Sequence, residues 1–194
     1  MQKRKKTRKE KIIERRDQQH KKKRFDKKNV LLTIFFFAGI ILTIFEISIY
    51  RVTIIHWSIP TGIWLSIGLI CSRFNAKILA NHMDAKTTFL QLIYNVASFG
   101  GVAVFCFMLL NFKSSDTNIR TYTFKIKRKS SMKGSSNSAE RKPIVEIDYF
   151  GLKKDIIFSY SDTENVNNAD RILLNVKDGR LGFDVILGKQ LISK

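Results

Sequence analysis

The 194-residue chain has little cysteine and little proline, with two residues of each. Two cysteines cannot build the multi-bridge framework of a small secreted scaffold. Cys71 and Cys106 both lie in apolar segments, where a thiol behaves as a small hydrophobic side chain. Histidine is also scarce, and the spacing of His20, His56 and His82 matches no zinc or haem motif. We therefore expect no metal ion and no cofactor.

The sequence also lacks the motifs of common enzyme classes. No glycine-rich loop has the Walker or Rossmann spacing that cradles phosphates, and no serine stands in a nucleophile elbow. Asp148, Asp155 and Asp184 fall in predicted strands with no base or metal ligand beside them, so we expect them to face solvent. With no cluster of reactive groups, the sequence predicts a protein that is not an enzyme.

Acidic residues are few beside the basic ones, 16 against 35, and the net charge is +19. Residues 1–28 hold most of the excess, with fifteen Lys or Arg against four Asp or Glu. Because this stretch has few apolar residues to bury, we expect a disordered polybasic arm. Next to a spanning helix, such an arm sets topology and binds the anionic headgroups of the lipid bilayer. Nucleic acid is disfavoured as a partner because Phe25 is the arm's single aromatic residue for base stacking.

What the chain does have is three long apolar runs, at residues 30–50, 54–71 and 89–111. About 20 apolar residues in a helix cross the hydrocarbon core of a bilayer. We therefore predict a transmembrane region over residues 29–112 with three spanning helices. The first run is too long for a cleavable signal peptide and no small-residue cleavage site follows it, so we expect an uncleaved anchor. Residues 72–88 are predicted to be a polar connector, in which 75–83 form a short amphipathic helix at the interface.

Candidate interfacial residues surround the short turn between the first two spans. A carboxylate within a span is a candidate for function, although Glu46 lies close enough to the boundary to reach the headgroups. His56 could pair with Glu46 at the same membrane face. Aromatic rings and snorkelling basic side chains are typical of this boundary, and the full set is Glu46, Tyr50, Arg51, His56 and Trp57.

The third run carries a polar stripe. Gln91, Asn95 and Ser98 fall on one helix face, and Gly101 adds a small residue near it. Small and weakly polar residues let helices approach closely and form hydrogen bonds with each other. We interpret the stripe as a helix-packing surface, and the alternative is a polar path for a transported solute.

From residue 118 the pattern changes to the alternation of β-strands. Alternating positions at 122–127 and 145–149 are followed by a Phe150-Gly151 turn into LKKDIIFSY. RILLNV and LGFDVI are two further strands, joined across Asp178-Gly179, a strong hairpin signal. Residues 130–142 and 161–170 are predicted loops, the first of them mobile. The sequence thus predicts an α+β membrane protein, with three transmembrane helices followed by a small antiparallel β domain at 118–194, either a curled sheet or a small barrel. We expect that domain to fold without the spans.

The segments FGLKKDIIFS and KDGRLGFDVI, in this order near the C-terminus, resemble those of small uncharacterised bacterial membrane proteins of the Bacteroidota type. Such proteins combine a few helices with a short β-rich tail domain. The resemblance is confined to the C-terminal β region and implies no activity.

The charges flanking the spans predict the orientation. The basic arm should remain in the cytoplasm, so three spans place the β domain outside, in the periplasm of a double-membrane bacterium. Basic residues after the third span oppose this orientation, but the arm is larger and is inserted first. We expect a multi-pass protein of the inner (plasma) membrane.

The predicted function is non-enzymatic binding, sensing or assembly by the β domain. Its partner would be another membrane protein, an envelope polymer or a second copy of the chain. The alternative is a small subunit of a transport or channel complex, with Gln91, Asn95 and Ser98 lining the path.

Overall fold

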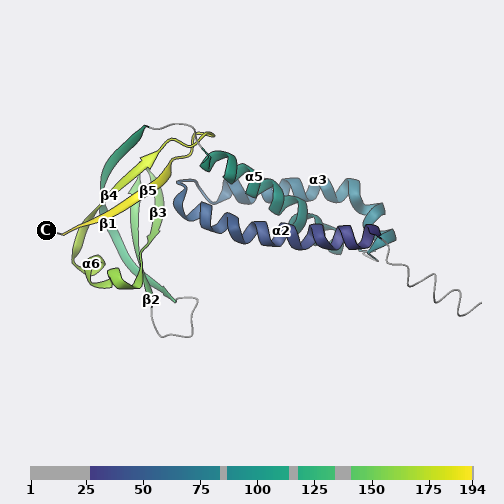
Figure 1. The fold of residues 1–194 in the computed structure, drawn as a ribbon, viewed down its shortest axis with the longest axis horizontal. Helices are drawn as coiled ribbons and strands as arrows, with labels where there is room; N and C mark the ends of the chain where they lie inside the picture. The colour runs from purple at the N-terminus through teal and green to yellow at the C-terminus, as the bar shows by residue number, and fades with distance from the viewer. Residues whose placement is uncertain (1–26, 84–86, 114–117, 134–140, 194) are drawn as a thin grey trace, which may run out of the picture.

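The computed structural model describes residues 27–83, 87–113, 118–133 and 141–193. Within these ranges the chain forms a bundle of long helices with a β domain at one end (Figure 1). Residues 1–26 of the predicted arm lie outside the described residues, as do residues 134–140 of the first predicted loop. The architecture confirms the predicted fold class, since three long apolar helical segments precede a five-stranded antiparallel sheet.

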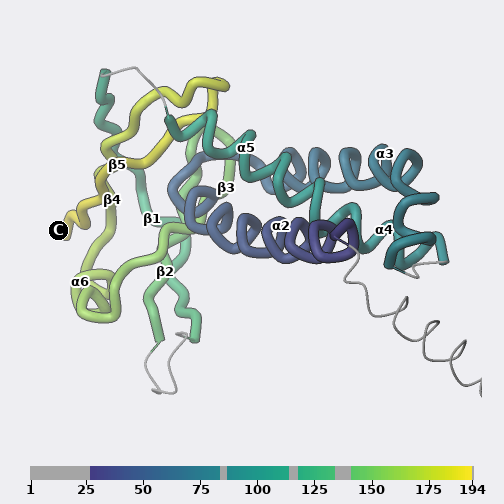
Figure 2. Tube along the Cα trace, turned by 45° about the vertical axis from the view of Figure 1, so that its right-hand side comes forward, coloured from purple at the N-terminus to yellow at the C-terminus, as the bar shows by residue number. Residues whose placement is uncertain are grey.

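The helical segments are α2 (Lys27–Val52), α3 (Ser58–His82) and a third stretch, Thr88–Phe112, each long and apolar enough to span a membrane. They run side by side (Figure 2). In the most apolar 18-residue segment of each helix, only 6% of the residues are buried in α2 and 17% in α3, against 39% in the third stretch. The first two helices thus leave apolar side chains exposed, as contact with lipid requires. These features mark the chain as a multi-pass membrane protein.

Helix α3 is longer than the sequence predicted. Residues 72–82, expected to belong to a polar connector with a separate short helix, continue α3 to His82. The stretch contains no proline or glycine to break the helix, and Leu79 within it is fully buried. That connector prediction was wrong for these residues. The turn between α2 and α3 is short, as expected, and occupies residues 53–57.

The third helical stretch contains an unpredicted π-helical turn. α4 (Thr88–Asn95) leads into η1, a π-helix at Val96–Gly100, and then into α5 (Gly101–Phe112). Glycines on both neighbouring helices face this turn. A Cβ atom at Gly68 of α3 would lie 2.4 Å from Cγ2 of Val96, and one at Gly39 of α2 would lie 2.5 Å from Cα of Ser98. The π turn is therefore packed between the glycines of α2 and α3.

The β domain is one antiparallel sheet with the strand order β3-β2-β1-β4-β5. The strands are β1 (Ile119–Lys133), β2 (Arg141–Tyr149), β3 (Leu152–Ile157), β4 (Ala169–Lys177) and β5 (Val185–Ser193). The long central strand β1 pairs with β4 through residues 119–125 and with β2 through residues 126–133. A register shift between Ile126 and Arg128 separates these two halves. Because β1 pairs with two strands in succession, the sheet curls. The curl brings its two edge strands together, and Lys189 Nζ on β5 donates a hydrogen bond to the carbonyl of Ile157 on β3.

The connections between strands agree only in part with the sequence. Phe150 and Gly151 have φ angles of 49° and 92°, as a tight two-residue hairpin turn requires. The Asp178-Gly179 connection is longer than a hairpin turn, since β4 ends at Lys177 and β5 begins only at Val185. The predicted loop at 161–170 instead contains η2 (Tyr160–Asp162) and the short helix α6 (Thr163–Asn168).

The core of the β domain includes a residue from the membrane region. Ile172, Leu174 and Val176 alternate inward on β4 and are fully buried. Ile54, from the turn between α2 and α3, belongs to the same apolar cluster. The described residues of the β domain therefore do not build this core alone.

Candidate functional site

The predicted polar stripe of the third span faces the other helices. Asn95 is fully buried, and its Oδ1 accepts a hydrogen bond from Nδ2 of Asn75 on α3 at 3.1 Å. Gln91 donates from Nε2 to the carbonyl of Ala76 at 3.3 Å. Ser98 is also fully buried and bonds to the backbone of its own segment. The stripe thus joins the third span to α3 through hydrogen bonds.

Gly101, the small residue of the stripe, lies against α2. A Cβ atom at Gly101 would lie 2.6 Å from Oγ1 of Thr43 and 2.7 Å from the carbonyl oxygen of Gly39. A Cβ atom at Gly39 would lie 2.4 Å from the carbonyl oxygen of Ala97. The two helices therefore approach backbone to backbone, which only glycine permits at these positions.

The predicted interfacial residues gather at the end of the bundle that meets the β domain. Three lie on the last two turns of α2 and two lie in the turn before α3. The His56 ring pairs with Oγ of Ser58, with its Nδ1 2.7 Å away. All five help to line two adjacent hollows described below: Glu46, Tyr50, Arg51, His56 and Trp57.

Lys154 of β3 ties the β domain to the end of α2. Its side chain is buried and donates to the carbonyl oxygens of Tyr50 at 2.9 Å and Thr53 at 2.6 Å. The carbonyl end of a helix carries partial negative charge, which favours a cation there. Burial nevertheless lowers the pKa of the Lys154 ammonium from 10.5 to about 8. In the sequence, this lysine occupies an inward position between Leu152 and Ile156, a signal that the sequence analysis missed.

The turn between α2 and α3 also joins the sheet. Thr53 forms an antiparallel bridge with Val185 at the start of β5. The amide of Ile54 donates to the carbonyl of Asp184 at 2.7 Å. With Lys154 on β3 bonded to the same turn, residues 53–54 are held by both edge strands of the curled sheet.

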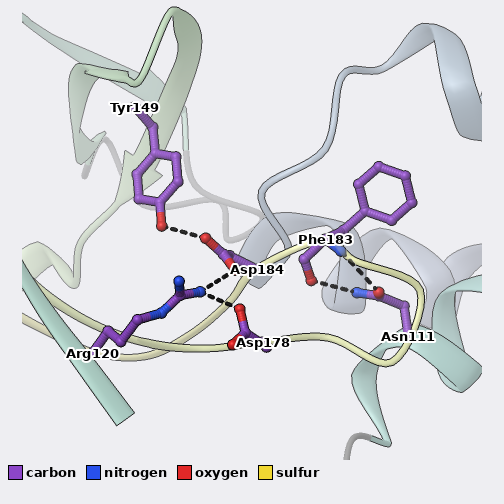
Figure 3. A network of polar contacts seen from close by, with 6 residues as sticks. All are labelled: Asn111, Arg120, Tyr149, Asp178, Phe183 and Asp184. Atoms are coloured by element: carbon purple, nitrogen blue, oxygen red, sulfur yellow. Dashed lines mark hydrogen bonds and ion pairs between the residues drawn. The ribbon is translucent and has the colours of Figure 1, made fainter. Parts of the chain in front are cut away.

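Asn111, at the end of α5, makes a second connection. Its Nδ2 donates to the carbonyl of Phe183 at 2.9 Å, and its Oδ1 accepts from the amide of Phe183 at 3.3 Å (Figure 3). The same Oδ1 also accepts from the amide of Leu181 at 3.1 Å. The fully buried side chain therefore holds the loop between β4 and β5 in place. The Phe183 ring packs 5.9 Å from the Phe107 ring of α5. No sequence pattern distinguishes Asn111 from other polar residues at the end of an apolar run.

Asp184 is the centre of a polar network beside this loop. Tyr149 donates its hydroxyl to Asp184 Oδ2 at 2.5 Å, and Arg120 donates to Asp184 Oδ1 at 2.9 Å and also to Asp178 (Figure 3). Burial, followed by the hydrogen bond to Asp184, raises the pKa of the Tyr149 phenol, so the hydroxyl keeps its proton. The expectation that Asp184 faces solvent was wrong, because its side chain is only 19% exposed. Asp148 and Asp155 are exposed, as expected.

The junction groove lies between the helix ends and the β domain and has a volume of about 780 Å³. Its polar rim includes Arg51, His56 and Lys153, and its apolar wall includes Ile55 and Leu152. The helix slot, of about 240 Å³, lies between α2 and α3. The two hollows share three lining residues, Ile47, Tyr50 and Trp57, and are therefore adjacent.

Over the described ranges of the chain, no three His, Cys, Asp or Glu side chains gather in a way that could hold a metal ion. The polar groups at the junction instead bond mostly to backbone carbonyls and amides. They fix the β domain on the helices. Comparisons with protein-family models, with curated proteins and with solved structures found no match.

Proposed function

We propose that this chain is a non-enzymatic membrane protein whose β domain acts as an extracytoplasmic binding or assembly module. The observation that carries the proposal is the fixed attachment of the β domain through Lys154, Asn111 and Ile54. A domain on a loose tether would not need buried hydrogen bonds to two different helix ends. Fixed attachment presents one surface of the domain at a constant distance from the bilayer.

The surface proposed to meet a partner is the α6 pocket, of about 480 Å³, between the β1–β2 hairpin and α6. Figure 1 places α6 on the side of the domain away from the helices. Lys129 and Arg141 contribute positive charge, and Tyr160 contributes an aromatic ring. These side chains favour an acidic surface, on another membrane protein, an envelope polymer or a second copy of the chain.

Photo-crosslinking in native membranes tests this proposal. A photoreactive amino acid replaces Ser130, an exposed residue that lines the α6 pocket. The matched control places it at Thr123, an exposed position on the same strand outside that pocket. We expect a discrete crosslinked species from position 130 only. Monomer alone from both positions would contradict the proposal.

The outside location of the β domain rests on the fifteen basic residues of the arm, which are expected to stay in the cytoplasm. An odd number of spans then separates the two ends of the chain. The test is Ser131→Cys, at an exposed position, with Cys71 and Cys106 both replaced by Ala. A membrane-impermeant thiol reagent should label it in cells whose outer membrane is permeabilised. Labelling only after lysis of the inner membrane would reverse the proposed orientation.

The alternative, a transport subunit, has less support. Its proposed path along Gln91, Asn95 and Ser98 consists of buried side chains that bond to α3 or to their own segment. Replacing all three by Leu distinguishes the roles: loss of a solute flux in a folded protein would favour transport, and loss of assembly would favour packing.

A further inference from the structure

The junction groove lies where a lipid headgroup would lie. Helix α2 ends at Val52, so the groove lies at the end of a membrane span, beside the β domain. Its apolar wall and basic rim together suit an amphipathic molecule. This position holds whichever side of the membrane the β domain occupies, so the inference does not depend on the proposed orientation.

The helix slot continues the junction groove toward the bundle. It is bounded by Thr43 and Ile47 of α2, by Pro60 and Trp64 of α3 and by Val104 of α5. Among the residues that the structure describes, Glu46 is the charged side chain that lines this slot. Because the neighbouring faces of α2 and α3 are exposed to lipid, part of an acyl chain can enter this slot from the bilayer.

The charges at the groove favour an anionic headgroup. Arg51 and Lys153 are exposed at its rim, and among the described lining residues the carboxylate that opposes them is Asp155. The buried Lys154 donates its hydrogen bonds to backbone carbonyls, so the charge available to a headgroup is set by the exposed residues of the rim. Glu46 precedes Arg51 by five residues, about 7.5 Å along the helix axis, so it lies deeper than a phosphate held by Arg51 would.

We propose that the junction groove and the helix slot together bind one phospholipid with an anionic headgroup. Arg51 and Lys153 hold its phosphate, Trp57 lies at the boundary between headgroup and chain, and part of an acyl chain occupies the slot beside Trp64. The bound lipid would fill the space between the β domain and the bilayer.

Tryptophan fluorescence tests the proposal directly, because Trp57 and Trp64 are the chain's two tryptophans and both line the slot. The full chain is reconstituted in two preparations of phosphatidylcholine vesicles. In one, a fixed fraction of the lipid is phosphatidylglycerol with brominated acyl chains. In the other, the same fraction is phosphatidylcholine with brominated acyl chains. Bromine quenches fluorescence on contact. One basic residue near a membrane surface strengthens anionic-lipid binding about fivefold, so Arg51 and Lys153 together should give a preference of about 25-fold for phosphatidylglycerol.

The double variant Arg51→Gln/Lys153→Gln should quench equally with both lipids. Lys153→Gln alone leaves α2 unchanged and should lower the preference about fivefold. The matched control is Lys125→Gln/Lys127→Gln, which removes the same charge from exposed positions of β1 outside the groove and should keep the preference.

Equal quenching in the wild type, or full preference in the double variant, would overturn the proposal. Reversal of the quenching by soluble glycerol phosphate would also overturn it, because the groove would then bind the free anion.

Discussion

Replacing Asn111 by Leu should loosen the loop between β4 and β5 without changing the helix. The substitution keeps the number and branching of the side-chain heavy atoms but leaves the Leu181 and Phe183 amides and the Phe183 carbonyl without their side-chain partner. Each such hydrogen bond contributes a net of about 1 kcal/mol. The free energy of local opening should therefore fall by about 3 kcal/mol, and amide exchange at Leu181 and Phe183 should accelerate on the order of 100-fold.

Hydrogen exchange followed by mass spectrometry, on the full chain in a bilayer mimic, measures this change. The amides of Leu173 and Leu174 in β4 report global unfolding and should stay slow. Asn165→Leu, on the exposed face of α6, is the matched control and should leave the exchange at Leu181 unchanged. Unchanged exchange of that amide in the Asn111 variant would refute the role given to this side chain. Equal acceleration throughout β4 would show a global destabilisation instead of a local one.

Three further changes have expected outcomes. Because the pKa of Lys154 falls from 10.5 in the unfolded chain to about 8 in the fold, the unfolded form binds more protons between these values. The unfolding free energy should therefore rise by roughly 3 kcal/mol from pH 8 to 10.5. Thermal melts should show this rise in the wild type and not in Lys154→Met. Identical pH profiles of the two proteins would contradict the prediction. Gly39→Leu should prevent helix packing and lower the yield of folded protein in gel filtration. The control Gly62→Leu should be tolerated, because a Cβ atom there meets nothing within 4 Å. Equal yields from the two variants would be inconsistent with close packing at Gly39. Ile54→Ala should destabilise the β domain by about 2–5 kcal/mol in chemical denaturation, although Ile54 precedes the domain by more than sixty positions. The control Ile78→Ala, at a 46% exposed site, should have little effect on that stability.

The fold class was predictable because hydrophobic length and alternation are local properties of the chain. Twenty or so apolar residues in succession have few stable arrangements outside a bilayer. The alternation in β4 placed Ile172, Leu174 and Val176 on one face, and all three are buried in the structure. The Phe150-Gly151 turn was identifiable because few residues adopt positive φ readily.

Element ends were less predictable. The polar residues at 72–82 continue α3 because helical hydrogen bonds carry on until a breaker or a cap stops them. Polarity marks where a helix leaves the apolar region, which is a different point from where the helix ends. The π turn at Val96–Gly100 also could not be read from the sequence, since no local pattern marks it and the glycines packed against it belong to two other helices.

Three apolar spans, a basic arm and a β domain were evident from the sequence, because each depends on composition or periodicity within one segment. How these parts are joined depends on contacts between distant segments, which form only in the folded chain. Lys154, Asn111 and Ile54 are ordinary residues of a strand, a helix and a turn, and each acquires its role from a partner distant in sequence. Such contacts leave no local pattern, because the position of the partner is set by the packing of the whole chain.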